Sequence, residues 1–213
     1  MIFEEIIFSN LAVTAIYFFV SFWVLGAGVK YIDDAFDEHT FSKKIAFLLA
    51  PILGIFWAYT MSLSLPATTI LLAIVIGVFI KGKIDNLAHQ IGLVCILAVV
   101  FFSGFFEVLW IPLVIITFFG VVDEIGNDFI DEHNVYSKMF PTGKLVHLFF
   151  EYRFAMKVAV FTFAFFGFFE YLYFVAFLGF DIGYAMLTKY SEKVSHYRKF
   201  SYTGKTINGE LSN

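Results

Sequence analysis

Long apolar segments dominate this chain and constrain its fold more than any other feature. Residues 91–122 form an apolar stretch long enough to cross a lipid bilayer twice. No water satisfies backbone N–H and C=O groups inside a bilayer, so a spanning segment must be a helix or part of a closed barrel. Hydrophobic residues make up 60% of the sequence and charged residues only 15%, with a mean hydropathy of +0.83. We therefore expect an all-α, polytopic transmembrane helical bundle.

We predict about seven membrane spans. They cover residues 6–29, 45–64, 66–80, two passes within 91–122 joined by a turn at 104–107, then 145–168 and 169–188. Several are shorter than the roughly 20 residues that a straight span needs, so we expect some helices to extend into the polar segments. Residues 1–188 would form a transmembrane helical domain. Residues 189–213, which are polar and lack periodicity, would form a solvated tail.

The polar segments predict the orientation of the chain. Segments 30–44, 81–90 and 123–144 follow the first, third and fifth spans, so they emerge on the same face as the tail. Nearly all basic residues lie on that face, where Lys30, Lys43, Lys44, Lys81, Lys83, Lys138 and Lys144 precede those of the tail. The opposite face carries carboxylates and no cation. By the positive-inside rule the acidic segments and the tail are cytoplasmic, and the N-terminus is outside.

Several classes of function are excluded by composition. The chain has one cysteine, Cys95, within an apolar segment, so it has neither a disulfide framework nor a cysteine-based metal site. Its net charge is −4, and it shows no glycine-rich nucleotide loop and no basic patch for nucleic acid.

Two similar acidic motifs are the strongest functional signal. Residues 33–39 read DDAFDEH, and residues 127–133 read NDFIDEH. In a helix, Asp33 and Asp37 share one face because they are four residues apart. Like charges at this spacing repel each other unless a counter-ion is present, and hard oxygen ligands suit Mg²⁺, Mn²⁺ or Ca²⁺. The repetition favours a divalent-cation site, and solvated helix caps are the alternative.

Histidines accompany both motifs and the polar segment between them. Asp85 and His89 lie one helical turn apart, in a weaker third version of the pattern. With His39 and His133, His89 could bind Zn²⁺ or another transition metal. The alternative is that these histidines are amphipathic side chains at the membrane interface.

Charged residues also occur within the sixth and seventh predicted spans. Arg153 and Lys157 are one turn apart, with Glu151 close by. Charges within a membrane normally face a cavity or one another. This group forms either an ion pair or a cationic clamp for a phosphate. Asp181 and Tyr184, in the last span, are expected to line the same cavity.

Aspartates clustered at one membrane face resemble those of the UbiA-type intramembrane prenyltransferases. Residues 33–37 (DDAFD) look like that family's Asn-Asp-x-x-Asp motif, and residues 123–127 (DEIGN) look like its second motif, often Asp-x-x-Gly-Asp. Residues 127–131 (NDFID) look like the first motif again. The chain departs from the family in its seven predicted spans rather than nine, and in Phe41, where a further Asp is expected.

The resemblance implies a site for two Mg²⁺ (or Mn²⁺) ions that bridge a prenyl diphosphate. The implied metal ligands are Asp33, Asp34, Asp37, Asp123, Asn127, Asp128 and Asp131, and Asp85, His89, Asp181 and Tyr184 are possible additional site residues. The metals would act as Lewis acids on the leaving diphosphate, assisted electrostatically by Arg153 and Lys157. The allylic cation would form between aromatic walls and react with a lipid-soluble acceptor.

Two other functions remain open from the sequence. Paired acidic helices also occur in divalent metal-ion transporters, where Pro51, Pro66 and Pro112 could break helices around an ion site. A different metal-dependent lipid enzyme, such as a phosphotransferase or hydrolase, could use the same Asp and His residues. All three hypotheses involve membrane lipid or a lipid phosphate and none involves nucleic acid.

Overall fold

The structure is a computed structural model that describes residues 10–105, 107–133 and 142–210. Its elements are α2 (Leu11–Phe36), α3 (Lys43–Ser62), α4 (Leu65–Ile80), α5 (Leu87–Ser103), α6 (Trp110–His133), α8 (Thr142–Glu151), α9 (Phe154–Phe165) and α10 (Tyr171–Glu210). No strand occurs in this described part of the chain. The all-α prediction is therefore confirmed.

Local capping signals set several helix ends. The side chain of Asn10 accepts a hydrogen bond of 2.8 Å from the backbone N–H of Ala12 at the start of α2, and Asn86 does the same for His89 of α5 at 2.9 Å. Gly104 ends α5 in the left-handed conformation, with φ of 67°. The turn predicted at residues 104–107 therefore lies between α5 and α6, as expected.

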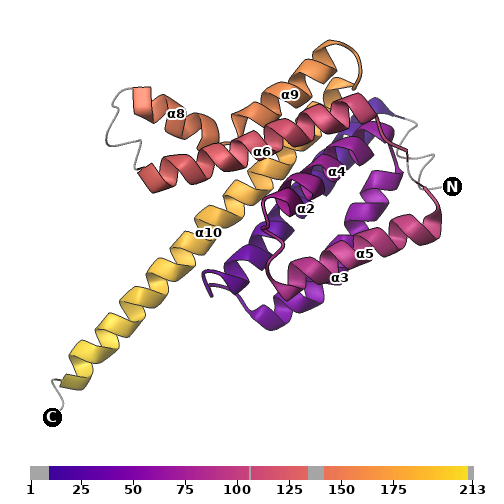
Figure 1. The fold of residues 1–213 in the computed structure, drawn as a ribbon. Coiled ribbons are helices and arrows are strands. Elements are labelled where there is room, and N and C mark those ends of the chain that lie inside the picture. Colours follow the sequence, from indigo (N-terminus) through magenta and orange to yellow (C-terminus); the bar gives the residue numbers. More distant parts are fainter. Residues whose placement is uncertain (1–9, 106, 134–141, 211–213) are drawn as a thin grey trace.

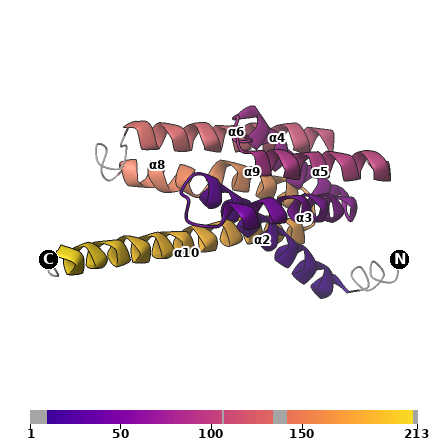
Figure 2. The same ribbon diagram turned by 90° about the horizontal axis from the view of Figure 1, so that it is seen from below.

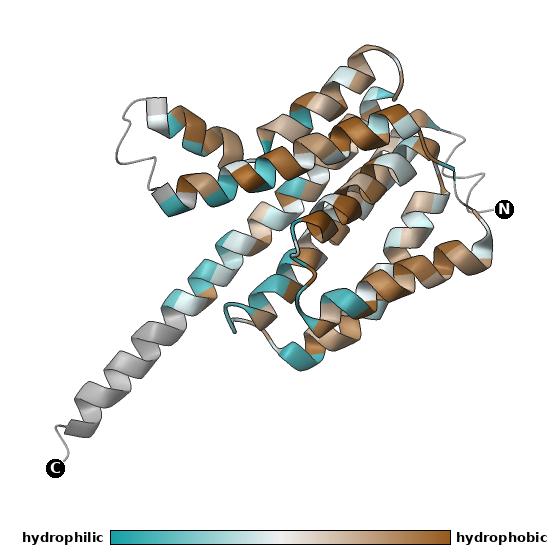
Figure 3. Cartoon of the chain, in the orientation of Figure 1, coloured by the Kyte–Doolittle hydropathy of each residue, from teal (hydrophilic) through white to brown (hydrophobic). Residues whose placement is uncertain are grey.

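Helices α2 and α10 run side by side through the molecule (Figures 1 and 2). α3 packs against α2 and α5, α4 packs against α6, and α9 packs against α6 and α10. Hydrophilic residues gather near the α2–α3 and α4–α5 connections and at one end of α6 (Figure 3). The bundle thus has a mainly apolar body and one end where polar side chains gather.

Buried apolar side chains hold α2, α4 and α10 together. Phe18, Phe22 and Leu25 of α2 and Ile70 of α4 are fully inaccessible, and Phe177 of α10 joins the same cluster. Close packing of such side chains makes this part of the bundle resistant to deformation. It therefore provides a rigid support for the polar residues that follow Leu25 along α2.

Glycines allow α2 and α10 to approach closely. A Cβ atom at Gly179 would lie 2.8 Å from the carbonyl oxygen of Phe19, and one at Gly183 would collide with the carbonyl oxygen of Trp23. Small residues four positions apart permit this approach of two helix backbones in membrane proteins. The contact places Tyr184, in the first half of α10, directly beside the first acidic motif.

The sixth predicted span, residues 145–168, is not one helix. α8 ends at Glu151 and α9 begins at Phe154, with Arg153 between them in the left-handed conformation at φ of 49°. Such a φ is unfavourable for a residue with a Cβ atom, so contacts outside the segment must hold it. The prediction of one continuous helix was wrong because those contacts come from α6, which lies far away in sequence.

Three of the described helices are long and apolar enough to cross a membrane: Leu11–Phe36, Lys43–Ser62 and Tyr171–His196. α4 has 16 residues, α5 has 17 and α9 has 12, all fewer than the roughly 20 of a straight span. Helix length thus supports a membrane protein with three candidate spans instead of the predicted seven. Residues 6–9, where the first predicted span begins, lie outside the described residues.

Helix α10 continues past the last predicted span. Its backbone is helical to Glu210, so residues 189–210 extend the helix into the segment that was expected to be a solvated tail. The far end of α10 projects beyond the other helices (Figure 1).

Candidate functional site

The first acidic motif opens onto a cavity of about 410 Å³ among α2, α3, α4, α5 and α10. Its apolar wall includes Val29, Ile32, Leu53, Trp57, Ile74, Leu93 and Ile96. Its polar part includes Lys30, Asp33, Asp34, Asp37, Lys83, Asp85, His89, Glu124, Arg153 and Tyr184. A cavity with an apolar wall and a few convergent polar groups is typical of a small-molecule site, and here the division suits an amphipathic ligand.

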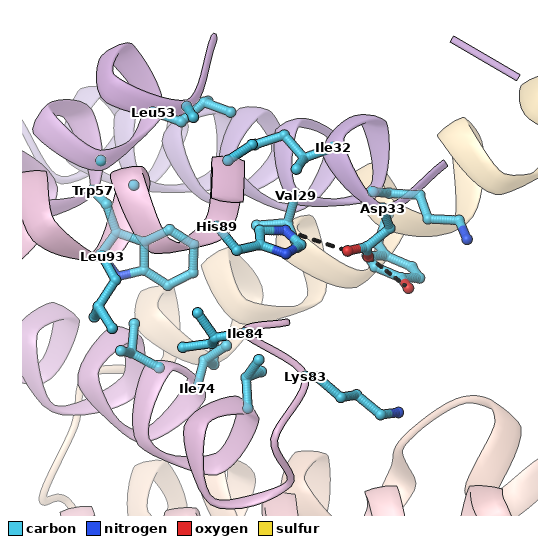
Figure 4. A pocket seen from close by; sticks show the side chains of 18 of the residues that line it. Val29, Ile32, Asp33, Leu53, Trp57, Ile74, Lys83, Ile84, His89 and Leu93 are labelled. Carbon is cyan, nitrogen blue, oxygen red and sulfur yellow. Dashed lines mark hydrogen bonds and ion pairs between the residues drawn. The ribbon is translucent and has the colours of Figure 1, made fainter. Parts of the chain in front are cut away.

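Asp33 links three helices within the polar part. Its Oδ1 lies 3.3 Å from Nε2 of His89 (Figure 4), and the Tyr184 hydroxyl donates a hydrogen bond of 3.4 Å to its Oδ2. The Asn86 amide nitrogen lies 2.8 Å from Nδ1 of His89, while its amide oxygen caps α5. Because the cap fixes the orientation of the amide, Nδ1 accepts, and the proton of a neutral His89 ring lies on Nε2, facing Asp33.

The other carboxylates of the first motif have different surroundings. Asp34 is 2% exposed, and Lys30 Nζ lies 2.9 Å from its Oδ1. Its Oδ2 has no hydrogen-bond partner within the described part of the structure. Asp37 and Glu38 are exposed at the rim of the cavity. Asp34 is therefore held by a lysine, whereas Asp33 faces a histidine and a tyrosine.

Glu124 of α6 brings two cations to the cavity. Nη2 of Arg153 lies 2.8 Å from its Oε1, and Lys83 pairs with its Oε2. The guanidinium of Arg153 also lies 5.1 Å from the ring centroid of Tyr184, which Lys30 approaches to 5.3 Å. Three cations from α2, the α4–α5 connection and the α8–α9 break thus border the polar part of the cavity.

Asp123, an implied metal ligand, instead caps α9. Its Oδ1 accepts a hydrogen bond of 3.0 Å from the backbone N–H of Ala155, and its Oδ2 accepts one of 2.7 Å from Met156. The carboxylate is 1% exposed, and this burial raises the pKa of Asp123 to about 6 although both hydrogen bonds act to lower it. The contact explains why α9 starts anew after Arg153.

Asn127 and Asp128 of the second motif do not line the cavity. Asp128 has a half-exposed side chain, and Lys81 Nζ lies 2.8 Å from its Oδ2. The hydrogen bond from Lys81 lowers the pKa of Asp128. Asn127 is half-buried on the same helix. The side chains of Asp131 and His133 lie outside the described part of the structure.

Lys157 and Asp181 form an ion pair beside the cavity. Nζ of Lys157 lies 2.6 Å from Oδ2 of Asp181, joining α9 to α10. Neither residue lines the cavity that contains Asp33 and Arg153. Asp181 was expected to line that cavity and does not. Tyr184, less than one turn further along α10, lines it as expected.

The implied metal ligands do not converge in this arrangement. The first motif faces the cavity, whereas Asp123 binds backbone amides and Asp128 binds Lys81. Among the side chains that the structure describes, no three His, Cys, Asp or Glu residues are grouped as ligands of one ion. The implied ligands whose side chains are described therefore do not fit the two-metal site that the resemblance implies, and a requirement for Mg²⁺ or Mn²⁺ stays a prediction.

No protein-family model, curated protein or solved structure matches the chain.

Sequence reasoning did not identify three residues that shape the cavity: Lys83, Glu124 and Trp57. Lys83 and Glu124 are separated by 41 positions, so no local spacing relates them. Trp57 lies in an ordinary apolar stretch of α3. The available signal for Glu124 was its position beside Asp123 at the polar end of an apolar segment, where an acidic side chain requires a partner.

Proposed function

We propose that this chain is a membrane enzyme that binds a prenyl diphosphate, or another lipid phosphate, and transfers the prenyl group to a lipid-soluble acceptor. The observation that carries the proposal is the division of the cavity into an apolar wall and a charged part. A lipid tail fits the first and a phosphate group fits the second. The resemblance of residues 33–37 and 123–127 to prenyltransferase motifs supports the reaction class.

We also infer a seven-pass topology with the N-terminus outside, in which α8 and α9 together make one pass. Seven of the twelve lysines lie in the polar segments 30–44, 81–90 and 123–144, which supports a cytoplasmic position for the first acidic motif. The shorter helices would be accommodated by local thinning of the bilayer and by their polar flanks.

In this proposal Lys83 and Arg153 hold the phosphate group. Together they carry two positive charges, which Glu124 only partly balances; Asp128 also lies 3.9 Å from Lys83. Arginine offers a planar pair of donors for phosphate oxygens, and lysine acts as a point charge. Glu124 keeps both cations at the cavity, and its burial strengthens these attractions by excluding water.

The proposal is tested with purified protein in detergent micelles and labelled geranylgeranyl diphosphate. We measure binding, and also diphosphate release when a lipid extract supplies the acceptor. Lys83→Gln is expected to weaken binding at least tenfold, because a hydrogen bond to a charged group contributes about 1.5–3 kcal/mol. The matched control is Lys81→Gln, two residues away, whose side chain pairs with the half-exposed Asp128 and does not line the cavity.

Failure of the wild-type protein to bind or cleave the diphosphate would end the proposal, as would equal loss in the two lysine variants. Addition of EDTA tests the predicted metal requirement in the same assay. The transport hypothesis predicts a different result, namely Mn²⁺ uptake into proteoliposomes with no diphosphate release.

A further inference from the structure

Trp57, in the second half of α3, lies in the apolar part of the cavity. Its side chain is 5% exposed and packs edge-on against Phe180 of α10, with ring centroids 5.8 Å apart. Figure 4 shows its indole beside Leu93, with His89 next along the cavity and Asp33 and Lys83 further on. Trp57 thus belongs to the region where a ligand would place its uncharged portion.

The indole N–H of Trp57 has no hydrogen-bond partner within the described residues. A buried tryptophan normally finds one, because an orphaned donor keeps the full penalty of its desolvation. His89, the polar side chain beside it in Figure 4, offers no acceptor: its Nδ1 is engaged by Asn86, and its Nε2 faces Asp33. The protein itself therefore leaves a donor unsatisfied on a residue that lines the cavity.

We infer that this donor recognises a neutral, membrane-soluble ligand through a carbonyl oxygen. The indole N–H can only donate a hydrogen bond, so the ligand must supply the hydrogen-bond acceptor atom. Hydrocarbon side chains surround this part of the cavity, from Leu53, Leu93 and Ile96. Such surroundings disfavour a charged hydrogen-bond acceptor and suit a neutral carbonyl group.

The inference rests on the proposed function in one respect, because it assigns this ligand as the substrate that accepts the prenyl group in the same enzyme. A prenyl tail is pure hydrocarbon and leaves the N–H unsatisfied, so the donor distinguishes the second substrate from the first. Discrimination of this kind is effective, because a site built around a buried polar group disfavours an analogue that leaves it unpaired.

The test uses full-length protein in detergent micelles, labelled with ¹⁵N at tryptophan. The chain has three tryptophans, so three indole N–H signals are expected, and Trp57→Phe assigns the relevant one. The probes are 2-undecanone and undecane, which share a chain length and differ in the carbonyl group. We expect 2-undecanone to move the Trp57 indole proton downfield and undecane to leave it in place.

Affinity provides the second measurement. Trp57→Phe keeps an aromatic ring against Phe180, and it is expected to weaken binding of 2-undecanone about three- to tenfold without changing the binding of undecane. The matched control, Trp110→Phe, replaces an exposed tryptophan on α6 and is expected to change neither affinity. Equal responses to the two probes, or no response of the Trp57 signal, would overturn the inference.

The same sample separates this inference from the proposed function. If geranylgeranyl diphosphate binds while 2-undecanone leaves the Trp57 signal unchanged, the inference fails and the proposed function stands. If 2-undecanone shifts the signal and the diphosphate does not bind, the proposed function fails and a carbonyl site remains.

Discussion

Replacement of Asp123 by asparagine tests how the buried carboxylate at the start of α9 responds to pH. Burial raises the pKa of this group in the folded protein to about 6, whereas an unperturbed aspartate has a pKa of about 3.9. The folded state therefore holds this proton more tightly than the unfolded state does. The contribution of protonated Asp123 to the free energy of unfolding is fully present below about pH 4 and is lost as the pH rises through about 6.

The size of this effect follows from the shift. About two pKa units at 1.36 kcal/mol each correspond to roughly 3 kcal/mol of unfolding free energy lost between about pH 4 and pH 7. For a chain of this length that is equivalent to a change of about 6–12 °C in Tm. The asparagine amide does not titrate in this range, so the Asp123→Asn variant should lack this component.

Thermal unfolding in detergent micelles, followed by circular dichroism at several pH values from 4 to 8, measures the effect. We expect the Tm of the wild-type protein to fall relative to that of Asp123→Asn as the pH rises across this window. The control is Asp128→Asn: the pKa of Asp128 is lowered by Lys81, so its weak contribution is lost as the pH falls instead. A pH-independent difference between wild type and Asp123→Asn would refute the account of a carboxylate whose burial raises its pKa.

Three further predictions follow from contacts that hold the site in place. Gly183→Ala is expected to lower the unfolding free energy by about 1–3 kcal/mol, because the added Cβ atom collides with α2. Its control is Gly77→Ala, which should be neutral or slightly stabilising because the added Cβ atom meets open space. Thermal unfolding compares the two variants. Lys157→Met leaves Asp181 buried without its cation and should cost about 3–5 kcal/mol, which the added Asp181→Asn change should largely restore in a double-mutant cycle. Asn86→Ala removes the cap of α5 and should cost about 1 kcal/mol while shifting the ¹⁵N signals of the His89 ring, as observed by NMR.

Much of the helical layout was predictable because its signals are local. Apolar segments of spanning length predicted most of the helices, and Gly104 marked the turn between α5 and α6. The division of the sixth segment at Arg153 was not predictable, because the carboxylate that caps α9 belongs to α6. The glycines on α10 offered a signal in their four-residue spacing, but only the packed structure identified α2 as their partner.

The candidate site was predicted only in part. The first motif, His89, Arg153 and Tyr184 were singled out from the sequence, and the structure gathers them at one cavity. Residues 127–133 have nearly the same letters as residues 33–39, yet Asp128 pairs with Lys81 whereas Asp33 faces His89 and Tyr184. Similar sequences received different environments because the direction in which a helix face points depends on what packs against it.

By itself, the sequence determined the class of the protein and the approximate position of its helices, because a backbone in lipid must satisfy its own hydrogen bonds. It also determined that charged groups would concentrate where apolar segments end. Only the tertiary structure decided which charges meet. Tyr184 and Asp33 are 151 positions apart, and Glu124 and Lys83 are 41 apart. Contacts over such separations depend on the packing of whole helices, which no local spacing encodes.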